Sequence, residues 1–322
     1  MRNAIEWRQA TVASVTEIAD GVRLLAFDVE GDLPPFEAGS HTNIKVTING
    51  RPAIRTYTCI PVGHGQLSIA VKLHPKSRGG SRHIFTLEPG MAVEMTVPEN
   101  RFELSWRASE YLLLAGGIGV TPIYGMARAL AGHGARVTMH YGAQNRAAMP
   151  FVDELEALLG DRLSLYSADD NQFVDLAAAI ERLPRDGELY VCGPLGMLEA
   201  VKKAWAEAGR PVSRLRYEVF GDNGKFAEET FEVEILNKNM TVVVPPDKTL
   251  LNALMDAGVE MIYDCQRGEC GLCAVEIVEA DAEVDHRDVF FSEEEKRESH
   301  RMCSCVSRLV KGHAVIDIGY RV

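Results

Sequence analysis

The feature that most constrains this chain is the placing of its cysteines near the C-terminus. The sequence there reads Cys265-Gln-Arg-Gly-Glu-Cys270-Gly-Leu-Cys273, and two further cysteines follow at Cys303 and Cys305. Three closely spaced cysteines with gaps of four and two residues, and a distant fourth, are the spacing of a plant-type [2Fe–2S] site. Such a cluster carries single electrons and cannot take a hydride. We therefore expect the rest of the chain to supply the electrons or to use them.

The residues between the cysteines fit this interpretation. Gly268 and Gly271 stand where a loop wrapped around a cluster needs residues without a β-carbon. Zinc is the main alternative, but zinc sites favour two closely spaced pairs of ligands rather than three bunched ligands and a remote one. A disulfide framework is disfavoured, because the chain is not small and begins without a signal-peptide pattern. Spacing alone leaves both Cys303 and Cys305 open as the fourth ligand.

Composition limits the class of protein. A length of 322 residues allows two or three domains, and 46% hydrophobic residues let each bury an ordinary core. The formal net charge of −12 argues against a nucleic-acid partner, which requires a basic surface. No apolar run is long enough to span a membrane, so we expect no membrane partner and a cytoplasmic location. The acidic stretch 276–298 is either a solvated face or a docking surface.

The pattern of apolar residues divides the chain into three domains and a linker. Residues 1–105 consist of short strands separated by turns, with a hairpin signal at Asn49-Gly50, and predict an antiparallel β-barrel. Residues 106–221 alternate strands with helices and predict an α/β domain with a doubly wound parallel sheet. Residues 222–230 form a glycine-rich polar linker. Residues 231–322 begin with a hairpin, and then a helix opened by Thr249 leads into the cysteine loop. This order is compatible with an α+β β-grasp ferredoxin domain.

Two weak motifs in the first domain suggest an anion site. Arg55-Thr-Tyr-Thr58 ends a presumed strand, and Arg78-Gly-Gly-Ser81 follows a second strand that ends at Lys72. A turn with two glycines suits phosphate, because exposed N–H groups can approach it closely. A helix expected from His83 would add a favourable dipole. Taken alone, each motif is also typical of an ordinary surface strand or turn.

The second domain carries a glycine turn between a strand and a helix. The sequence Ala115-Gly-Gly-Ile-Gly-Val-Thr-Pro122 predicts a helix capped by Thr121, with Pro122 in its first turn. Glycines at such a helix N-terminus let a pyrophosphate approach, although a tight turn is the plainer interpretation. Cys192-Gly-Pro194 ends a later strand of the same sheet, where a free cysteine is often only a small buried hydrophobe.

The end of the chain resembles a known family. The segments that carry the resemblance are Asp285-His-Arg-Asp288, Ser292-Glu-Glu-Glu-Lys296 and Cys305-Val-Ser-Arg308, and they are similar to the phthalate dioxygenase reductase and vanillate demethylase reductase family. The resemblance implies that the cysteine opening Cys-x-Ser-Arg is the fourth ligand. The implied cluster ligands are Cys265, Cys270, Cys273 and Cys305, with Cys303 as a nearby spare.

The same resemblance implies a flavin site in the first domain. Tyr57 would lie along the isoalloxazine, Thr58 near its N5 edge, and Arg55 with Ser81 at the phosphate. The backbone of residues 70–72 would line the ribityl chain, and FMN rather than FAD is implied. The implied flavin-binding residues are Arg55, Thr56, Tyr57, Thr58, Ala70, Val71, Lys72, Gly79, Gly80 and Ser81.

A nicotinamide site in the second domain is implied in the same way. Cys192 would lie near the hydride-donating carbon, and Phe220 would stand against the flavin, although Phe220 also suits a plain apolar strand end. Because Arg146 is the one basic residue after the second strand and no basic cluster forms, NADH is favoured over NADPH. The implied residues are Gly116, Gly117, Gly119, Thr121, Pro122, Cys192, Gly193, Pro194 and Phe220.

The three motif sets, in the order flavin, nicotinamide and cluster, predict an NADH-dependent flavin iron–sulfur oxidoreductase. The resemblance implies that it is the reductase component of a two-component Rieske-type oxygenase and passes electrons to that separate protein. Two alternatives stay open. The acceptor could instead be a cytochrome P450 or a diiron hydroxylase, or the chain could be an iron–sulfur redox sensor or binding module.

Overall fold

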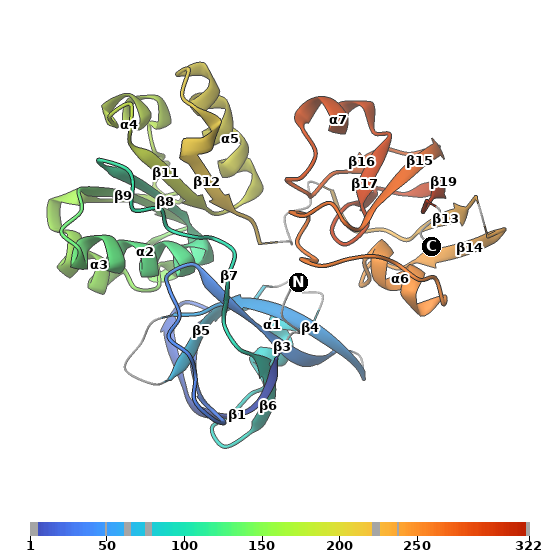
Figure 1. The fold of residues 1–322 in the computed structure, drawn as a ribbon, viewed down its shortest axis with the longest axis horizontal. Coiled ribbons are helices and arrows are strands. Elements are labelled where there is room, and N and C mark those ends of the chain that lie inside the picture. Colours follow the sequence, from blue (N-terminus) through green and yellow to red (C-terminus); the bar gives the residue numbers. More distant parts are fainter. Residues whose placement is uncertain are drawn as a thin grey trace. The chain divides into compact units, whose positions relative to one another are not determined.

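The structure of the protein, a computed structural model, divides into two compact units that we describe separately. They span Met1–Glu218 and Val219–Val322, and Figure 1 colours the chain along its length. The structure describes residues 6–48, 50–60, 66–74, 79–220, 226–236 and 238–319, with Arg51 described by its backbone alone.

An antiparallel sheet forms the first part of the first unit. Across the sheet the order is β4-β3-β6-β1-β2-β5, and β7 pairs with β3. An isolated bridge joins Ile60, just beyond β4, to Ser68 in β5, so the two edges come together and the sheet curls into the predicted barrel. The elements are β1 (Trp7–Ala19), β2 (Val22–Val29), β3 (Ser40–Ile48), β4 (Arg51–Thr58), β5 (Leu67–Lys72), α1 (Gly80–Ile84), β6 (Ala92–Thr96) and β7 (Glu99–Asn100).

Alternation of side chains explains the core of this barrel. Leu25 and Phe27 in β2, and Ile44 in β3, are fully buried, because residues two apart on a strand point to the same face. The predicted turn joins β3 to β4 as an antiparallel hairpin, with Ile48 opposite Arg51. Asn49 itself lies outside the described residues.

A parallel sheet forms the rest of the first unit. Its order is β10-β9-β8-β11-β12, and every neighbouring pair is parallel. The chain reverses its direction of travel across the sheet between β8 and β11, and in such sheets ligands bind beyond the carboxyl ends of the strands at that point. The strands are β8 (Tyr111–Gly116), β9 (Val137–Ala143), β10 (Leu163–Ser167), β11 (Glu188–Cys192) and β12 (Leu215–Glu218).

Helices cover both faces of the parallel sheet, as the predicted doubly wound fold requires. In Figure 1, α2 and α3 lie on one face and α4 and α5 on the other. None of the helices in the described ranges is long and apolar enough to cross a membrane. The elements are α2 (Val120–Gly132), α3 (Val152–Leu159), α4 (Leu176–Arg182) and α5 (Leu195–Glu207), with 3₁₀ turns η1 (Gly117–Gly119), η2 (Arg146–Ala148), η3 (Gly160–Arg162) and η4 (Val212–Arg214).

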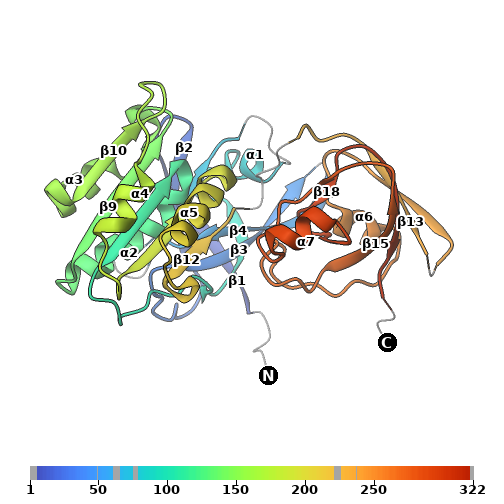
Figure 2. The same cartoon turned by 90° about the horizontal axis from the view of Figure 1, so that it is seen from above.

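The second unit is built on a mixed sheet, and it has the predicted opening hairpin. The order is β14-β13-β19-β15-β17, with a separate two-stranded pair of β16 and β18. As predicted, Thr249 caps α6 by accepting the Asn252 N–H at 3.1 Å, and α6 packs on the sheet core (Figure 2). The elements are β13 (Phe231–Ile235), β14 (Met240–Val244), α6 (Leu250–Asp256), β15 (Ala274–Ala280), β16 (Val284–Asp285), α7 (Glu293–Glu298), β17 (Arg301–Cys303), β18 (Arg308–Leu309) and β19 (Gly312–Asp317).

Candidate functional site

The end of β4 carries the predicted flavin motif, and the barrel buries its last residue. Thr58 lies opposite His41 of β3, and its buried Oγ1 has no hydrogen-bond partner among the described residues. The Thr56 hydroxyl is already committed, because it donates to Asn43 Oδ1 at 2.7 Å. A buried hydroxyl without a partner costs free energy unless a bound group completes it. Thr58 therefore fits the edge of a flavin.

The predicted phosphate turn lies directly beside Arg55. A β-carbon on Gly80 would come within 2.8 Å of Arg55 Nε, and one on Gly79 would come within 2.5 Å of the Ile48 side chain. Only glycine at these positions lets the turn approach side chains of β3 and β4 so closely. The structure thus brings Arg55 and the glycine turn together, while Arg78 lies outside the described residues.

Helix α1 begins three residues before the predicted start at His83. Gly79 adopts a left-handed conformation with φ 98° and turns the chain, so the helix already starts at Gly80. Ser81 is consequently in the first turn, where its Oγ accepts the His74 N–H at 3.3 Å. The hydroxyl predicted to meet a phosphate is therefore held next to the end of β5.

Strand β5 presents one edge of the barrel to this region. Ala70 and Val71 are buried, whereas Lys72 is half-buried, and Tyr57 of β4 packs against the same core. Apart from the bridge at Ser68, the outer edge of β5 pairs with no other strand in the described part of the chain. Backbone groups along that edge are suited to a chain-like ligand such as a ribityl group.

In the parallel sheet, the glycine turn after β8 touches the loop after β11 backbone to backbone. A β-carbon on Gly119 would lie 2.4 Å from the carbonyl oxygen of Cys192, and one on Gly116 would lie 3.1 Å from the Cα of Gly193. Gly117 differs, because its φ is 52° and a β-carbon there would meet nothing within 4 Å. The open side at Gly117 fits a pyrophosphate that approaches the backbone N–H groups.

The start of α2 differs from the prediction. Its N-cap is Gly119 rather than Thr121, which lies inside the first turn and donates its hydroxyl to the Ile118 carbonyl at 3.1 Å. The prediction of a Thr121 cap was wrong because the 3₁₀ turn η1 runs directly into the helix and moves its start backwards. Pro122 is in the first turn, as predicted, and Pro194 is the N-cap of α5.

The strand ends that carry Thr58 and Cys192 meet through Glu218. Glu218, the last residue of β12, lies opposite Cys192 in the register of β11 and β12 and is buried. Burial, and after it the charge of Glu218, raises the pKa of Cys59, which directly follows Thr58. The flavin motif and the nicotinamide motif therefore both end within electrostatic reach of Glu218 in the first unit. Sequence reasoning missed Glu218, because the order of strands that brings it here is not visible locally.

Sequence reasoning also missed a carboxylate beyond β10. Asp169 accepts a hydrogen bond from Asn145 at 3.0 Å and another from Gln144, and these bonds, that of Asn145 foremost, lower the pKa of Asp169. Arg146 is already engaged, because it binds Glu156 of α3 through contacts of 2.7 and 2.8 Å. The carboxyl ends of β9 and β10 thus present a fixed carboxylate, while the nearby guanidinium is neutralised.

The cysteine loop of the second unit has the backbone that the sequence predicted. Gln266, Gly268 and Gly271 have left-handed φ values of 51°, 74° and 70°. A β-carbon on Gly268 would lie 2.8 Å from the Cα of Asp288, and one on Gly271 would lie 2.3 Å from the ring of Phe290. Both glycines are required by conformation and by space.

Backbone N–H groups of this loop point at sulfur. The N–H groups of Arg267 and Glu269 each donate to Cys265 Sγ at 3.4 Å, and the Cys270 side chain lies within hydrogen-bonding distance of the same sulfur. Donors of this kind favour a thiolate and tune the potential of a bound cluster. Cys265 and Cys270 therefore form one pair of sulfurs.

A second group of sulfurs surrounds Cys273. The thiols of Cys303 and Cys305 both hydrogen-bond to Cys273 Sγ and hold the pKa of Cys273 well below that of a free thiol. Cys305 also receives the backbone N–H of Gly268 and lies within electrostatic reach of Cys265. Cys305 thus interacts with both the start of the cysteine loop, at Cys265, and its end, at Cys273. Cys303 lies in β17 opposite Ala274.

The arrangement in pairs suits two irons. A [2Fe–2S] cluster needs two thiolates on each of two irons, and the sulfurs gathered around Cys265 and around Cys273 can supply them. The donor set therefore fits the predicted cluster better than it fits zinc.

Two buried arginines bind the segment that leads into β13. Arg287 donates to Glu228 at 2.6 Å and to Asp285 at 2.7 Å, and Arg308 donates to the Glu229 carbonyl at 2.6 Å. Residues 222–225 of the predicted linker lie outside the described residues. Residues 228 and 229, also assigned to the linker, are fastened to the segments around the late cysteines.

Three domain families match the chain in the order flavin, nicotinamide, cluster. Residues 9–104 match an oxidoreductase FAD-binding domain, residues 113–203 an oxidoreductase NAD-binding domain, and residues 233–310 a 2Fe-2S iron-sulfur cluster binding domain. The predicted barrel, α/β and ferredoxin folds are thereby confirmed.

Full-length relatives have the same organisation. The chain is 33% identical to the tetrachlorobenzoquinone reductase of Sphingobium chlorophenolicum, over 99% of this chain and 100% of that protein. It is also 33% identical to the vanillate O-demethylase oxidoreductase of Pseudomonas sp., over 94% and 99%. The solved structure of phthalate dioxygenase reductase superposes with a TM-score of 0.78 at 28% identity, covering 97% of this chain and 98% of that one. The chain is an NADH-dependent flavin iron–sulfur oxidoreductase and belongs to the phthalate dioxygenase reductase and vanillate demethylase reductase family.

Proposed function

We propose that this protein is the reductase component of a two-component Rieske-type oxygenase, with FMN as its flavin. The observation that carries the proposal is that Glu218 lies opposite Cys192 in the sheet and acts electrostatically on Cys59, which directly follows Thr58. A hydride donor bound over Cys192 and a flavin bound at Thr58 would be neighbours there. When bound, the nicotinamide supplies a hydride, the flavin accepts it, and the cluster carries the electrons singly.

The chain's own residues contribute positioning and exclusion of water. The tight backbone contact between Gly119 and Cys192 holds the two loops of the nicotinamide site against each other. The open side of Gly117 receives the pyrophosphate. The Thr58 hydroxyl is placed to hydrogen-bond the flavin edge, and the buried Glu218 carboxylate keeps the surroundings polar. Such fixed geometry brings the reacting atoms together without further ordering.

The proposed cluster ligands are Cys265, Cys270, Cys273 and Cys305. Their support is the contact of Cys305 with both limbs of the cysteine loop. We expect Cys305→Ser to abolish the cluster's visible absorbance and to leave NADH-to-flavin reduction intact. Cys303→Ser is the matched control and should keep the cluster. The opposite result in the two variants would reverse the assignment.

We further propose that Asp169 makes the protein select NADH. Asp169 stands beyond β10, beside the nucleotide-binding end of the sheet, and two amides hold its carboxylate in place. A carboxylate in such a position can accept from a ribose 2′-hydroxyl and repels a 2′-phosphate. The engagement of Arg146 with Glu156 removes the one nearby basic candidate for binding that phosphate.

The identity of the acceptor is tested by reconstitution. Relatives include a vanillate O-demethylase oxidoreductase and a tetrachlorobenzoquinone reductase, so the panel should contain purified Rieske oxygenases, a cytochrome P450, a diiron hydroxylase and a halogenated quinone. We expect NADH consumption to be coupled to product formation with a Rieske oxygenase. Coupling with another acceptor alone would replace the proposed partner. Failure to reduce cytochrome c with NADH would favour a sensor instead.

A further inference from the structure

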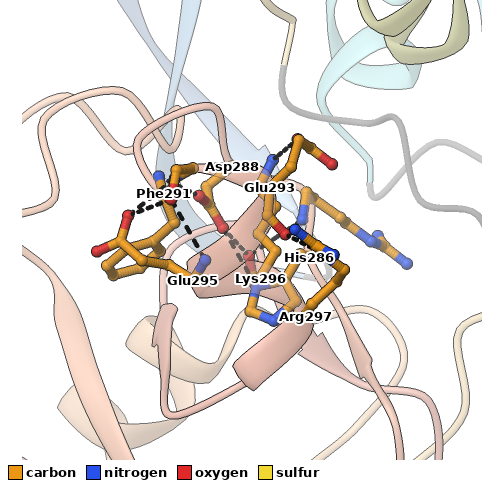
Figure 3. Close-up of polar contacts among 10 residues, drawn as sticks. His286, Asp288, Phe291, Glu293, Glu295, Lys296 and Arg297 are labelled. Atoms are coloured by element: carbon orange, nitrogen blue, oxygen red, sulfur yellow. Dashed lines mark hydrogen bonds and ion pairs between the residues drawn. The ribbon is translucent and has the colours of Figure 1, made fainter.

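Two of the segments that carry the family resemblance, residues 285–288 and 305–308, interlock in the second unit through a buried aspartate. Asp288 is fully buried, and Figure 3 shows it next to Phe291. Its Oδ2 accepts the Phe291 N–H at 3.0 Å, and its Oδ1 accepts the Ser307 hydroxyl at 2.8 Å. Burial of a carboxylate is costly unless such donors satisfy it. The proposed function leaves this aspartate without a role.

The hydroxyl of Ser307 links the two segments in both directions. Its oxygen accepts the Arg287 N–H at 3.1 Å, and its one proton goes to Asp288 Oδ1. Ser307 is 1% exposed. Removal of the hydroxyl would therefore leave two buried partners, the Arg287 N–H and Asp288 Oδ1, without it.

Asp288 also contacts the cysteine loop. A β-carbon on Gly268 would lie 2.8 Å from the Cα of Asp288, so the two backbones touch. The Val289 N–H donates to the Gly268 carbonyl at 3.0 Å. Because Gly268 has a left-handed φ of 74°, a conformation that glycine leaves easily, these contacts hold it in one orientation.

The contacts of Asp288 converge on Cys305. The Cys305 sulfur receives the Gly268 N–H, and Ser307 lies two residues further along the chain. The Ser307 N–H donates to the Cys303 carbonyl at 2.9 Å and closes a tight turn around Cys305. A shift of Ser307 is therefore passed on to Cys305. Asp288 thus holds both the donor and the acceptor of this N–H···S bond.

The bond from Ser307 is the contact of Asp288 that joins distant parts of the chain. Phe291 lies three residues after Asp288, so its N–H orders a turn within one segment. His286 Nδ1 lies 3.6 Å from Asp288 Oδ1, which is beyond hydrogen-bonding distance. Ser307, in contrast, is 19 residues away in the sequence. A change at Ser307 therefore loosens the link between the segments and leaves Asp288 in place.

We propose that Asp288 and Ser307 form a positioning pair that holds the Cys305 sulfur against the Gly268 N–H and thereby raises the reduction potential of the cluster. The proposal rests on Cys305 being a cluster ligand, as proposed above. Reduction adds a negative charge that the ligand sulfurs share, and an N–H donor stabilises that charge. A sulfur held less closely to its donor therefore gives a lower potential.

The test is a potentiometric titration of the cluster in the intact holoprotein of Ser307→Ala, followed by visible absorbance. We expect this variant to bind the cluster and to have a lower midpoint potential than the wild type. It should also lose the cluster to EDTA about ten times faster, the order of effect that unpairing a buried group produces. Ser307→Thr keeps the hydroxyl and should return both values toward those of the wild type.

Ser292→Ala is the matched control, because it also removes a serine hydroxyl from the second unit. That hydroxyl caps α7, where it accepts the Glu295 N–H at 3.3 Å and donates to the Glu295 carboxylate at 2.9 Å. Loss of the cap should lower the melting temperature of the unit. The potential should stay at the wild-type value, because the cap bonds to Glu295 and not to Asp288 or Ser307.

A Ser307→Ala protein with the wild-type midpoint potential would overturn the proposal. An equal fall in Ser292→Ala would do the same, because the potential would then follow stability alone. If Ser307→Ala does not fold or binds no cluster, Ser307→Thr decides. A wild-type potential in Ser307→Thr supports the pair, and a lowered potential or a lost cluster there overturns it. Failure of the ligand assignment is seen separately, as a visible cluster spectrum that persists in Cys305→Ser.

Discussion

Replacement of Arg287 by methionine should destabilise the second unit strongly. The Arg287 side chain is 3% exposed and bridges Asp285, 1% exposed, and Glu228, 27% exposed. Methionine fills most of the same space but leaves the Asp285 carboxylate buried without its cation. Breaking a buried ion pair in this way costs about 3 to 5 kcal/mol. For a unit of this size, each kcal/mol lowers the melting temperature by roughly 4 to 8 °C, so we expect a drop of at least roughly 12 °C.

The assay is thermal unfolding of the intact holoprotein, followed by loss of the cluster's visible absorbance. Release of flavin fluorescence serves as an internal reference for the first unit, which should melt unchanged. Arg297→Met is the matched control, because Arg297 is exposed on α7 and its side chain donates to the Glu293 carbonyl. The double variant Asp285→Asn with Arg287→Met removes the buried charge as well, and it should recover most of the lost stability. If the single variant melts with the wild-type protein, the assigned role of the ion pair is wrong.

Two further predictions concern the nicotinamide domain. Gly119→Ala should lower the melting temperature of the first unit, because its β-carbon would overlap the Cys192 carbonyl. Gly117→Ala should cost about 1 to 2 kcal/mol of stability, because alanine is strained at a φ of 52°. It should also raise the KM for NADH, because its β-carbon projects into the open side, and a loss of stability as large as that of Gly119→Ala would contradict this distinction. Asp169→Ser should lower the ratio of kcat/KM for NADH over that for NADPH while leaving ferricyanide reduction at saturating NADH unchanged. An unaltered ratio would refute the proposed role of Asp169.

The sequence predicted the fold class well because each domain has a strong local signature. Each signature lies in a short stretch of sequence. The signatures are the alternation of side chains in strands such as β2, the glycine turn beside Gly117 and the spacing of the cysteines. The Thr121 cap failed for a local reason, since a 3₁₀ turn ahead of the helix supplied an earlier start. Local patterns were therefore reliable for the type of an element and weaker for its boundary.

The residues that the sequence did not reveal depend on contacts between distant segments. Glu218 reaches the flavin motif because β12 pairs with β11, and β11 with β8. Asp169 is held by Asn145 and Gln144, which follow a different strand, β9. No spacing rule describes such residues, because their function comes from tertiary neighbours.

The two halves of the proposed nicotinamide-nucleotide site differ in how freely evolution can alter them. The half around Gly119 and Cys192 is made of backbone in contact with backbone, so almost any substitution there acts on the fold before it acts on the ligand. The half around Asp169 is made of exposed side chains held by Asn145 and Gln144, and substitutions there leave the sheet intact. A lineage built on this scaffold could therefore change its nucleotide many times while its hydride-transfer geometry stayed the same.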